Sequence, residues 1–239
     1  MGLGMSALLL IAALTGCGTT QQETASNEIS VSQTDSHYPV TVESYNYAGD
    51  VVTTTYEKAP ERVIAVYQGS IETMLALGLE EHVVASYGLD NAVKEEWEDG
   101  LSKMNYHEEV FAPSKEDVMM LEPDMIFSWG SLFGEKKLGD VDQWISRGTN
   151  TYINTNTRAG GYDRTLEHEY TDILNIGKIF DVEEKAQALV DEMKQEIEDA
   201  LAKTKGKEAQ TVSVIEFLND DISNYGASSL AGDMITQLG

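Results

Sequence analysis

The sequence contains one cysteine among 239 residues, which excludes an internal disulfide and a zinc cage built from several thiolates. Basic residues are also scarce. The 16 Lys and Arg against 41 Asp and Glu give a formal net charge of −25, too few cations for the basic face that nucleic acid requires. Hydrophobic residues make up 41% and charged residues 24%, which is ordinary globular usage and excludes a disordered chain or a multi-span membrane protein. At roughly 150 residues per domain, one to two domains are expected.

The short motifs that mark common catalytic centres are missing as well. The chain has no HExxH, GxSxG, Walker, EF-hand or CxxC pattern. Its four histidines are scattered along the chain: His37, His82, His107 and His168. A metal site built from three of them is therefore not expected. We expect a protein that is not an enzyme and that has no resident cofactor or metal ion.

The single cysteine follows an apolar N-terminal run. Residues 3–14 (LGMSALLLIAAL) are too short to cross about 30 Å of hydrocarbon but suit the core of a secretory signal. The sequence LTGC at 14–17 resembles the lipobox of bacterial lipoproteins, in which Cys17 is lipidated and becomes the first mature residue. The alternative is a buried or stray thiol. Residues 1–16 hold no Lys or Arg, although a signal peptide begins with a positive segment, so the true start could lie upstream.

These features predict a signal peptide at 1–16 and a lipid anchor on the outer face of the cell membrane. Residues 17–37 are rich in Ser, Thr, Gln and Asn and have almost nothing to bury, so they are expected to form a flexible tether. The folded part should begin near Tyr38.

From Tyr38 to Tyr56, apolar and polar residues alternate around Ala48, Gly49 and Asp50, which predicts a β-hairpin. The next hundred residues alternate β-branched runs with segments of helical period. Strands are expected at 63–67, 83–87, 125–129 and 151–153, with Gly69 and Ser70 as turn and N-cap of the first helix and Ser114 as the N-cap of a later one. This alternation predicts an α/β fold with a mainly parallel sheet covered on both faces.

The C-terminal third is expected to be helical first and mixed afterwards. Helices are predicted at 166–180 and 182–203, and the second has a continuous apolar face. Residues 211–217 (TVSVIEF) then predict a new strand with Tyr225 beyond its end. A first lobe at 38–180, a long helix at 181–205 and the start of a second, incomplete α/β lobe at 206–239 are therefore expected.

Ligands of open α/β sheets bind outside the carboxyl ends of the strands. The residues at those positions are aromatic or polar: Tyr67, Gln68, Tyr87, Trp129, Ser131, Asn154, Asn156 and Arg158. Large rings, amides and a guanidinium suit a bulky, partly polar small molecule, and the guanidinium suits an anionic group. Alternatively, each ring covers the core beneath its own loop, and Arg158 is a solvated surface residue.

Four blocks carry a family resemblance: ERVIAVYQGSIETMLALGLEEHVVAS at 61–86, SKEDVMMLEPDMIFSW at 114–129, NIGKIFDVEEKAQALVDEM at 175–193 and GASSLAGDMITQLG at 226–239. In this order they resemble the class III substrate-binding lipoproteins of ABC importers, which bind ferric siderophores, haem or cobalamin between two lobes joined by one rigid helix. The family's second lobe is normally much longer than the 206–239 segment, so the sequence looks truncated.

The resemblance implies a monomeric, membrane-tethered protein that captures a small molecule, most simply a ferric siderophore, and delivers it to an ABC permease. Glu72 matches a glutamate that docks on the permease, and Asp233 stands near the second docking position. Tyr225 occupies a ligand-contact position of the second lobe. Haem or cobalamin binding, a surface sensory or partner-binding ectodomain, and a surface enzyme are the alternatives. A neighbouring kinase gene would favour the sensor, and turnover of a substrate would favour the enzyme.

Overall fold

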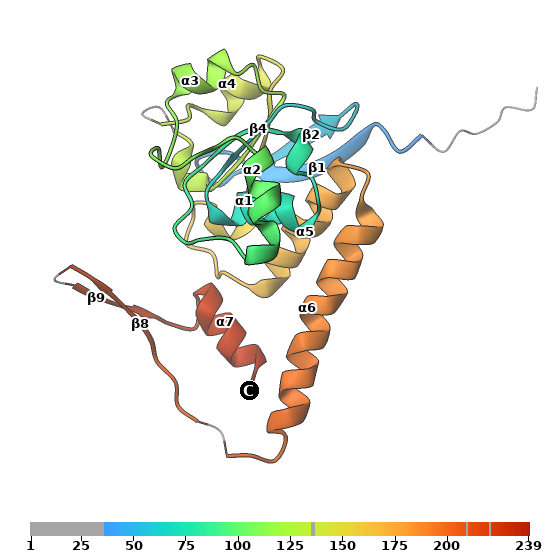
Figure 1. Cartoon of the computed structure of the whole chain (residues 1–239). Helices are drawn as coiled ribbons and strands as arrows, with labels where there is room; N and C mark the ends of the chain where they lie inside the picture. Colours follow the sequence, from blue (N-terminus) through green and yellow to red (C-terminus); the bar gives the residue numbers. More distant parts are fainter. Residues whose placement is uncertain (1–35, 135–136, 209, 220) are drawn as a thin grey trace, which may run out of the picture. The chain divides into compact units, whose positions relative to one another are not determined.

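The computed structural model describes residues 36–134, 137–208, 210–219 and 221–239 (Figure 1). The expected signal peptide, Cys17 and nearly all of the expected tether therefore lie outside the described residues. Among the residues that are described, no helix is both long enough and apolar enough to cross a bilayer.

The described chain opens with the predicted hairpin. Strands β1 (Val40–Tyr45) and β2 (Val51–Tyr56) pair antiparallel, with Tyr45 opposite Val51. The side-chain oxygen of Asn46 accepts hydrogen bonds from the backbone N–H groups of Ala48 and Asp50, at 2.9 and 3.0 Å. This local bonding holds the turn, as is typical of Asn at such positions.

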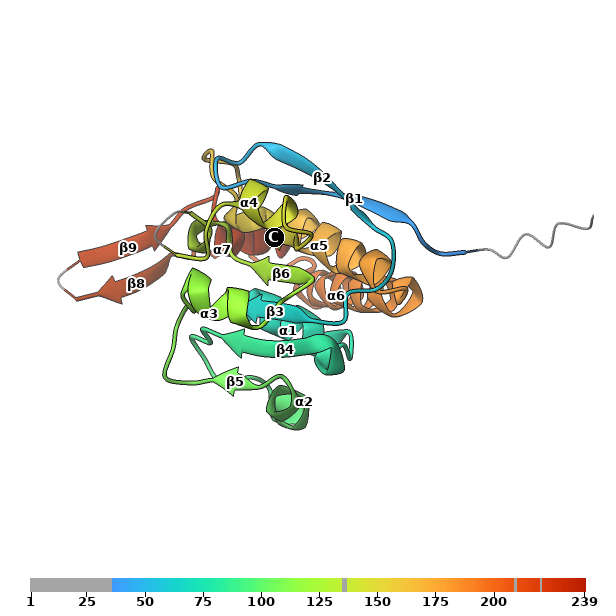
Figure 2. The same ribbon diagram turned by 90° about the horizontal axis from the view of Figure 1, so that it is seen from above.

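A five-stranded parallel sheet follows. Its strands are β3 (Val63–Val66), β4 (Val83–Tyr87), β5 (Tyr106–His107), β6 (Met125–Ser128) and β7 (Asn150–Ile153). The spatial order is β5-β4-β3-β6-β7, and Figure 2 shows β6, β3, β4 and β5 side by side. The chain thus starts at β3, builds outward through β4 and β5, and then returns to the other side of β3. The mixed α/β fold with a mainly parallel sheet is confirmed.

Both faces of the sheet are covered, because alternate residues of each strand point in opposite directions. Val63 and Ala65 join the core under α1 (Gln68–Ala76), α5 (Leu166–Ile179) and α6 (Glu183–Thr204). Ile64 and Val66 join the core under α3 (Lys115–Met120) and α4 (Val141–Ile145). Short pieces complete the lobe: α2 (Glu98–Lys103) and the 3₁₀ turns Glu80–His82, Glu95–Trp97, Gly130–Leu132 and Thr155–Thr157.

The predicted start of the first helix was wrong by three residues. α1 begins at Gln68, and Tyr67 is its N-cap with φ of 85° and no side-chain cap. Ser70 lies inside the helix, is buried, and donates a hydrogen bond to the Asn154 side-chain oxygen at 2.8 Å. Ser114, by contrast, caps α3 as predicted, since its Oγ accepts from the Asp117 N–H.

Three helices and a hairpin form the last third of the described chain. α5 and α6 end and begin close to the predicted bounds, and they pack together at Gly177, where an added Cβ would lie 2.3 Å from the Ala186 Cβ. Strand β8 (Val214–Leu218) overlaps the run predicted to be a strand, 211–217, and β9 (Asp221–Tyr225) pairs with it antiparallel. The sequence did not predict β9 as a strand. The chain ends with α7 (Leu230–Gln237).

Candidate ligand-binding site

The strand order of the sheet reverses at one position, between β3 and β6. Between β3 and β6 the chain changes the direction in which it builds the sheet. In open α/β sheets the crevice at such a switch point, outside the carboxyl ends of the strands, is where ligands bind. Tyr67 directly follows β3 and Trp129 directly follows β6, so the switch point is flanked by two aromatic residues.

The two rings are in direct contact. Tyr67 and Trp129 have ring centroids 3.9 Å apart with an interplanar angle of 35°, and Phe111 meets Tyr67 edge-on at 6.0 Å. The Tyr67 hydroxyl donates to the Asp90 carboxylate at 2.5 Å. Tyr67 and Trp129 are both half-buried and so remain partly accessible. They form a polar-tipped aromatic surface at the sheet edge, as the sequence predicted for these two residues.

The backbone of Tyr67 is strained at this position. A φ of 85° is an outlier for a bulky residue, and strain of this kind clusters at ligand sites. The pKa of the Tyr67 hydroxyl is raised, first by burial and then by its hydrogen bond to Asp90. Tyr225 also raises it, whereas Arg164 opposes the shift. Arg164 and Tyr225 therefore lie close enough to Tyr67 to act on its charge.

Gln68 organises the loop beside these rings. Its side-chain oxygen accepts from the backbone N–H groups of Asp90 and Asn91, at 3.0 and 3.1 Å, and its Nε2 donates to Glu72 at 2.7 Å. This bonding holds the loop after β4 against the first turn of α1. The predicted ligand residue Gln68 thus positions Asp90, the partner of Tyr67.

Arg158 provides a cation whose hydrogen bonding is incomplete. Its Nη1 donates to the Tyr45 hydroxyl at 2.6 Å, and its guanidinium lies 3.8 Å above the Tyr162 ring centroid and 4.9 Å from that of Tyr45. Its Nε is buried and has no hydrogen-bond partner among the described residues. The Nε atom is covered by protein and is not open to a ligand, so only the rest of the guanidinium could meet an anionic ligand group.

Three predicted ligand residues are buried instead. Tyr87 is 4% exposed and stacks on His107 with centroids 4.6 Å apart, while Asn154 is 7% exposed and bonds with Ser70. Asn156 is 8% exposed. Its amide bonds four neighbouring groups: the Thr165 oxygen and N–H, Glu169 and His168. In this structure these three side chains support the site from beneath, and Ser131 is exposed at its edge.

The two candidate permease contacts, Asp233 and Glu72, and the candidate ligand residue Tyr225 all have hydrogen-bond partners within the chain. The Asp233 carboxylate accepts from the Leu166 N–H at 2.8 Å and so occupies the N-terminus of α5, where a negative charge is favourable. Glu72 is half-buried, and Gln68 donates to its carboxylate. Tyr225 ends β9, which pairs with β8, and its hydroxyl donates to Glu216 of β8. Phe111, Asp90 and Arg164 were missed, because none of them follows a strand directly.

A buried carboxyl group lies beneath this edge of the sheet. Asp172 of α5 is 1% exposed and accepts from the Thr155 N–H at 2.7 Å, the Thr155 hydroxyl at 2.6 Å and the Tyr152 hydroxyl at 2.9 Å. Burial raises its pKa to about 7, against the opposing effect of the Thr155 and Tyr152 hydrogen bonds. The nearby Glu169 charge raises it further.

This shift predicts a pH-dependent stability. Between about pH 4 and pH 7 the folded state keeps the Asp172 proton that the unfolded chain releases, so the free energy of unfolding should fall as pH rises through this window. The contribution is up to about 4 kcal/mol at 1.36 kcal/mol per pKa unit. Glu169 has a raised pKa and acts in the same direction, whereas the lowered pKa of His168 acts in the opposite one.

Urea unfolding of the wild type and of Asp172→Asn at pH 4.5, 6 and 8 isolates the contribution of Asp172 from the other groups. The advantage of the wild type over the variant should shrink as the pH rises. Parallel curves at the three pH values would show that Asp172 does not titrate in this range.

The parallel five-stranded sheet with its single long helix is the fold of the class III periplasmic binding proteins. The chain belongs to the periplasmic binding protein family, whose model matches residues 63–239. This is a family of binding proteins and not of enzymes, which confirms that expectation.

Individual relatives agree with this assignment. The chain is 27% identical over 238 residues to the uncharacterized ABC transporter substrate-binding lipoprotein YvrC of Bacillus subtilis, covering 97% of this chain and 69% of that protein. A periplasmic binding protein structure from Veillonella parvula is 32% identical with a TM-score of 0.78, covering 84% and 64% of the two chains. The petrobactin-binding protein YclQ of Bacillus subtilis shares the fold, at 24% identity and a TM-score of 0.61, over 84% of this chain and 65% of that one. The chain thus spans about two thirds of the length of these proteins.

Proposed function

We propose that this chain is the capture component of an ABC importer and that its cargo is a ferric siderophore. The observation that carries the proposal is the contacting pair of Tyr67 and Trp129 at the switch point of the sheet, with ring centroids 3.9 Å apart and both residues half-buried. Flat, polar-tipped rings suit the aromatic or amide arms of such a ligand. The similarity to a petrobactin-binding protein supports this ligand class.

Charge gives the second argument. The protein carries a formal net charge of −25, so an anionic complex is repelled by most of its surface. Arg158, whose guanidinium is held by Tyr45, and Arg164, which acts on the Tyr67 pKa, supply the positive charge of the proposed site. Ser131 at the site edge and Tyr225 complete the proposed contacts, and Tyr87, Asn154 and Asn156 hold these residues in place.

The remaining parts of the proposal follow from the family. We infer that Cys17 carries the lipid that holds the protein on the outer face of the cell membrane, with residues 17–37 as the tether. The protein would act as a monomer and deliver its ligand to an ABC permease, with Glu72 as one docking contact. Asp233 would serve as the second contact only if it leaves the N-terminus of α5, where it is hydrogen-bonded.

Trp129 makes capture measurable. Ferric siderophores absorb light, so binding on the Trp129 ring should quench tryptophan fluorescence of the complete protein. The Trp129→Phe variant should lose most of the quenching, whereas the Trp97→Phe variant, which removes a ring outside the site, should keep it. Isothermal titration of the same ligands should show an affinity loss of at least about fivefold for Tyr67→Ala, because an aromatic contact contributes about 1 kcal/mol or more.

Two outcomes would contradict the proposal. If a panel of ferric hydroxamate, catecholate and carboxylate complexes gives neither fluorescence quenching nor binding heat, the siderophore class is excluded. Haem and cobalamin, included in the same panel, would then reveal the alternative ligand. Equal quenching in Trp129→Phe and the wild type would place the ligand away from the Tyr67–Trp129 pair.

A further inference from the structure

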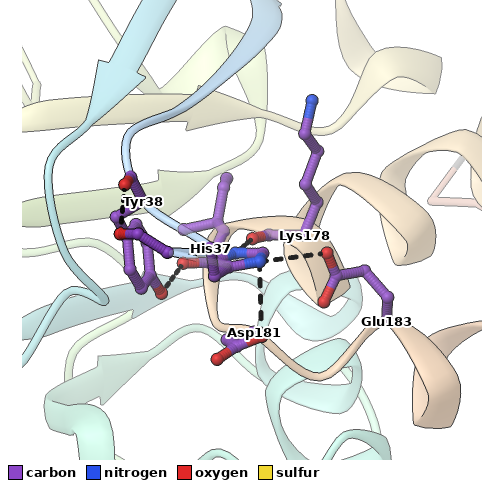
Figure 3. A network of polar contacts seen from close by, with 7 residues as sticks. His37, Tyr38, Lys178, Asp181 and Glu183 are labelled. Carbon is purple, nitrogen blue, oxygen red and sulfur yellow. Dashed lines mark hydrogen bonds and ion pairs between the residues drawn. The ribbon is translucent and has the colours of Figure 1, made fainter. Parts of the chain in front are cut away.

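Three side chains that could bind a metal ion meet where the tether joins the folded lobe. His37 precedes β1, Asp181 lies in the turn between α5 and α6, and Glu183 begins α6. Figure 3 shows the His37 ring directed at both carboxylates. One ligand atom from each of the three residues lies within 4.8 Å of the others.

The protonation of the His37 ring follows from its backbone contact. Nε2 lies 2.7 Å from the carbonyl oxygen of Lys178, and a carbonyl can only accept, so Nε2 carries a proton. The other nitrogen, Nδ1, faces Asp181 Oδ1 and Glu183 Oε1, each at 3.3 Å. A histidine that binds a metal ion through one nitrogen usually donates its other N–H to a carbonyl or carboxylate in this way.

The distances favour an ion over a hydrogen bond. Charge-assisted N–H···O bonds measure about 2.7–2.9 Å, shorter than both contacts of Nδ1. Ligand atoms at about 2.0–2.1 Å around a tetrahedral zinc ion are separated from one another by about 3.3 Å. Two carboxylate oxygens at this separation from one nitrogen leave room for the ion among them.

We propose that His37 Nδ1, Asp181 and Glu183 form a binding site for one divalent transition-metal ion of the zinc class. Imidazole with carboxylates suits zinc, copper and nickel, whereas calcium and magnesium prefer oxygen alone. The side chains of the two acids are 60% and 48% exposed and that of His37 is 18% exposed, so a water molecule can complete the coordination.

The surrounding structure holds the three ligands in place. The Tyr38 ring packs edge-on against His37 at 4.5 Å, and its hydroxyl donates to the Ile179 carbonyl at 2.7 Å. Asp181 adopts a left-handed conformation with φ of 57°, and the Val182 N–H bonds to the Gly177 carbonyl at 2.8 Å. The ion would fasten the start of the hairpin to the α5–α6 corner. This site shares no residue with the proposed siderophore site.

The test is a titration of the complete, untagged protein with zinc chloride. We expect one zinc ion per chain, with an affinity loss of at least about a hundredfold in His37→Gln and Asp181→Asn, since each removes a ligand. Asparagine tolerates the left-handed backbone, so the second variant should fold normally. Glu183→Gln should also weaken binding, whereas Glu184→Gln, at the next position of the same helix turn, should bind as the wild type does.

A second readout is the thermal midpoint, which saturating zinc should raise in the wild type and in Glu184→Gln but not in His37→Gln. The proposal is overturned if the wild type binds no zinc, or if His37→Gln binds it with unchanged affinity. The first of these results would mean that the cluster is only an ion pair of a protonated His37.

Discussion

Replacing Asp172 with alanine should lower the free energy of unfolding by about 3 kcal/mol, because the change leaves several buried donors without an acceptor. The Tyr152 hydroxyl, the Thr155 hydroxyl and the Thr155 N–H all donate to this carboxyl group. Asn175 in turn donates to the Tyr152 oxygen at 2.9 Å, so the loss extends through a connected network. Asp172 also anchors Thr155, in the turn after β7, to α5.

Urea unfolding at pH 7 measures this effect as a lower midpoint with an unchanged slope. Asp191→Ala is the matched control, because Asp191 is an exposed helical aspartate whose carboxylate accepts one side-chain hydrogen bond, from Gln187. Its cost should stay within about 0.5 kcal/mol. Equal costs for the two variants would show that the buried network contributes nothing particular to stability.

Replacing Gly177 with valine should lower the free energy of unfolding by about 3 kcal/mol, and alanine by about 2 kcal/mol. A Cβ at this position would lie 2.3 Å from the Ala186 Cβ, so α5 and α6 would have to move apart. Helix propensity alone predicts the opposite, since alanine stabilises a helix relative to glycine by about 1 kcal/mol. The sign of the change therefore separates the steric effect from the backbone effect.

A double-mutant cycle tests the assignment to this one contact. Ala186→Gly removes the clashing methyl group, so the Gly177→Ala, Ala186→Gly pair should be more stable than the sum of the single changes predicts. Gly69→Ala is the matched control, because an added Cβ there meets only the Asn154 amide at 3.7 Å. Additive costs in the cycle, or a stabilised Gly177→Ala variant, would contradict the prediction.

Much of the fold was predictable because its signals are local. Buried parallel strands read as apolar runs such as VIAV at 63–66, and α6 shows its apolar face by spacing. The start of α1 was not predictable, since Ser70 is a good N-cap by type but is bonded inside the core to a residue 84 positions away. Strand β9 was not predicted, because the two residues between β8 and β9, at positions 219 and 220, include no Gly or Pro.

The candidate site was predictable only as a rim. Strand ends mark which residues reach the edge of the sheet, and they correctly brought Tyr67 and Trp129 together. The position of a residue at a strand end does not predict which groups its side chain will hydrogen-bond to in the folded protein. The side-chain amide of Asn156 is hydrogen-bonded to Thr165, Glu169 and His168. The Tyr87 ring is covered by His107, which belongs to a two-residue strand that the sequence hardly indicates.

The N-terminal hairpin has a consequence for the order in which the chain acquires its structure. The hydroxyl of Ser44 accepts from the Ile153 N–H, 109 positions away, and the Tyr38 hydroxyl donates to the Ile179 carbonyl, 141 positions away. Strands β1 and β2 therefore lack these contacts until most of the described lobe has been synthesised. Such distant contacts form slowly, because a long loop must close before they contribute. The earliest part of the folded lobe should thus be among the last to become protected from amide exchange.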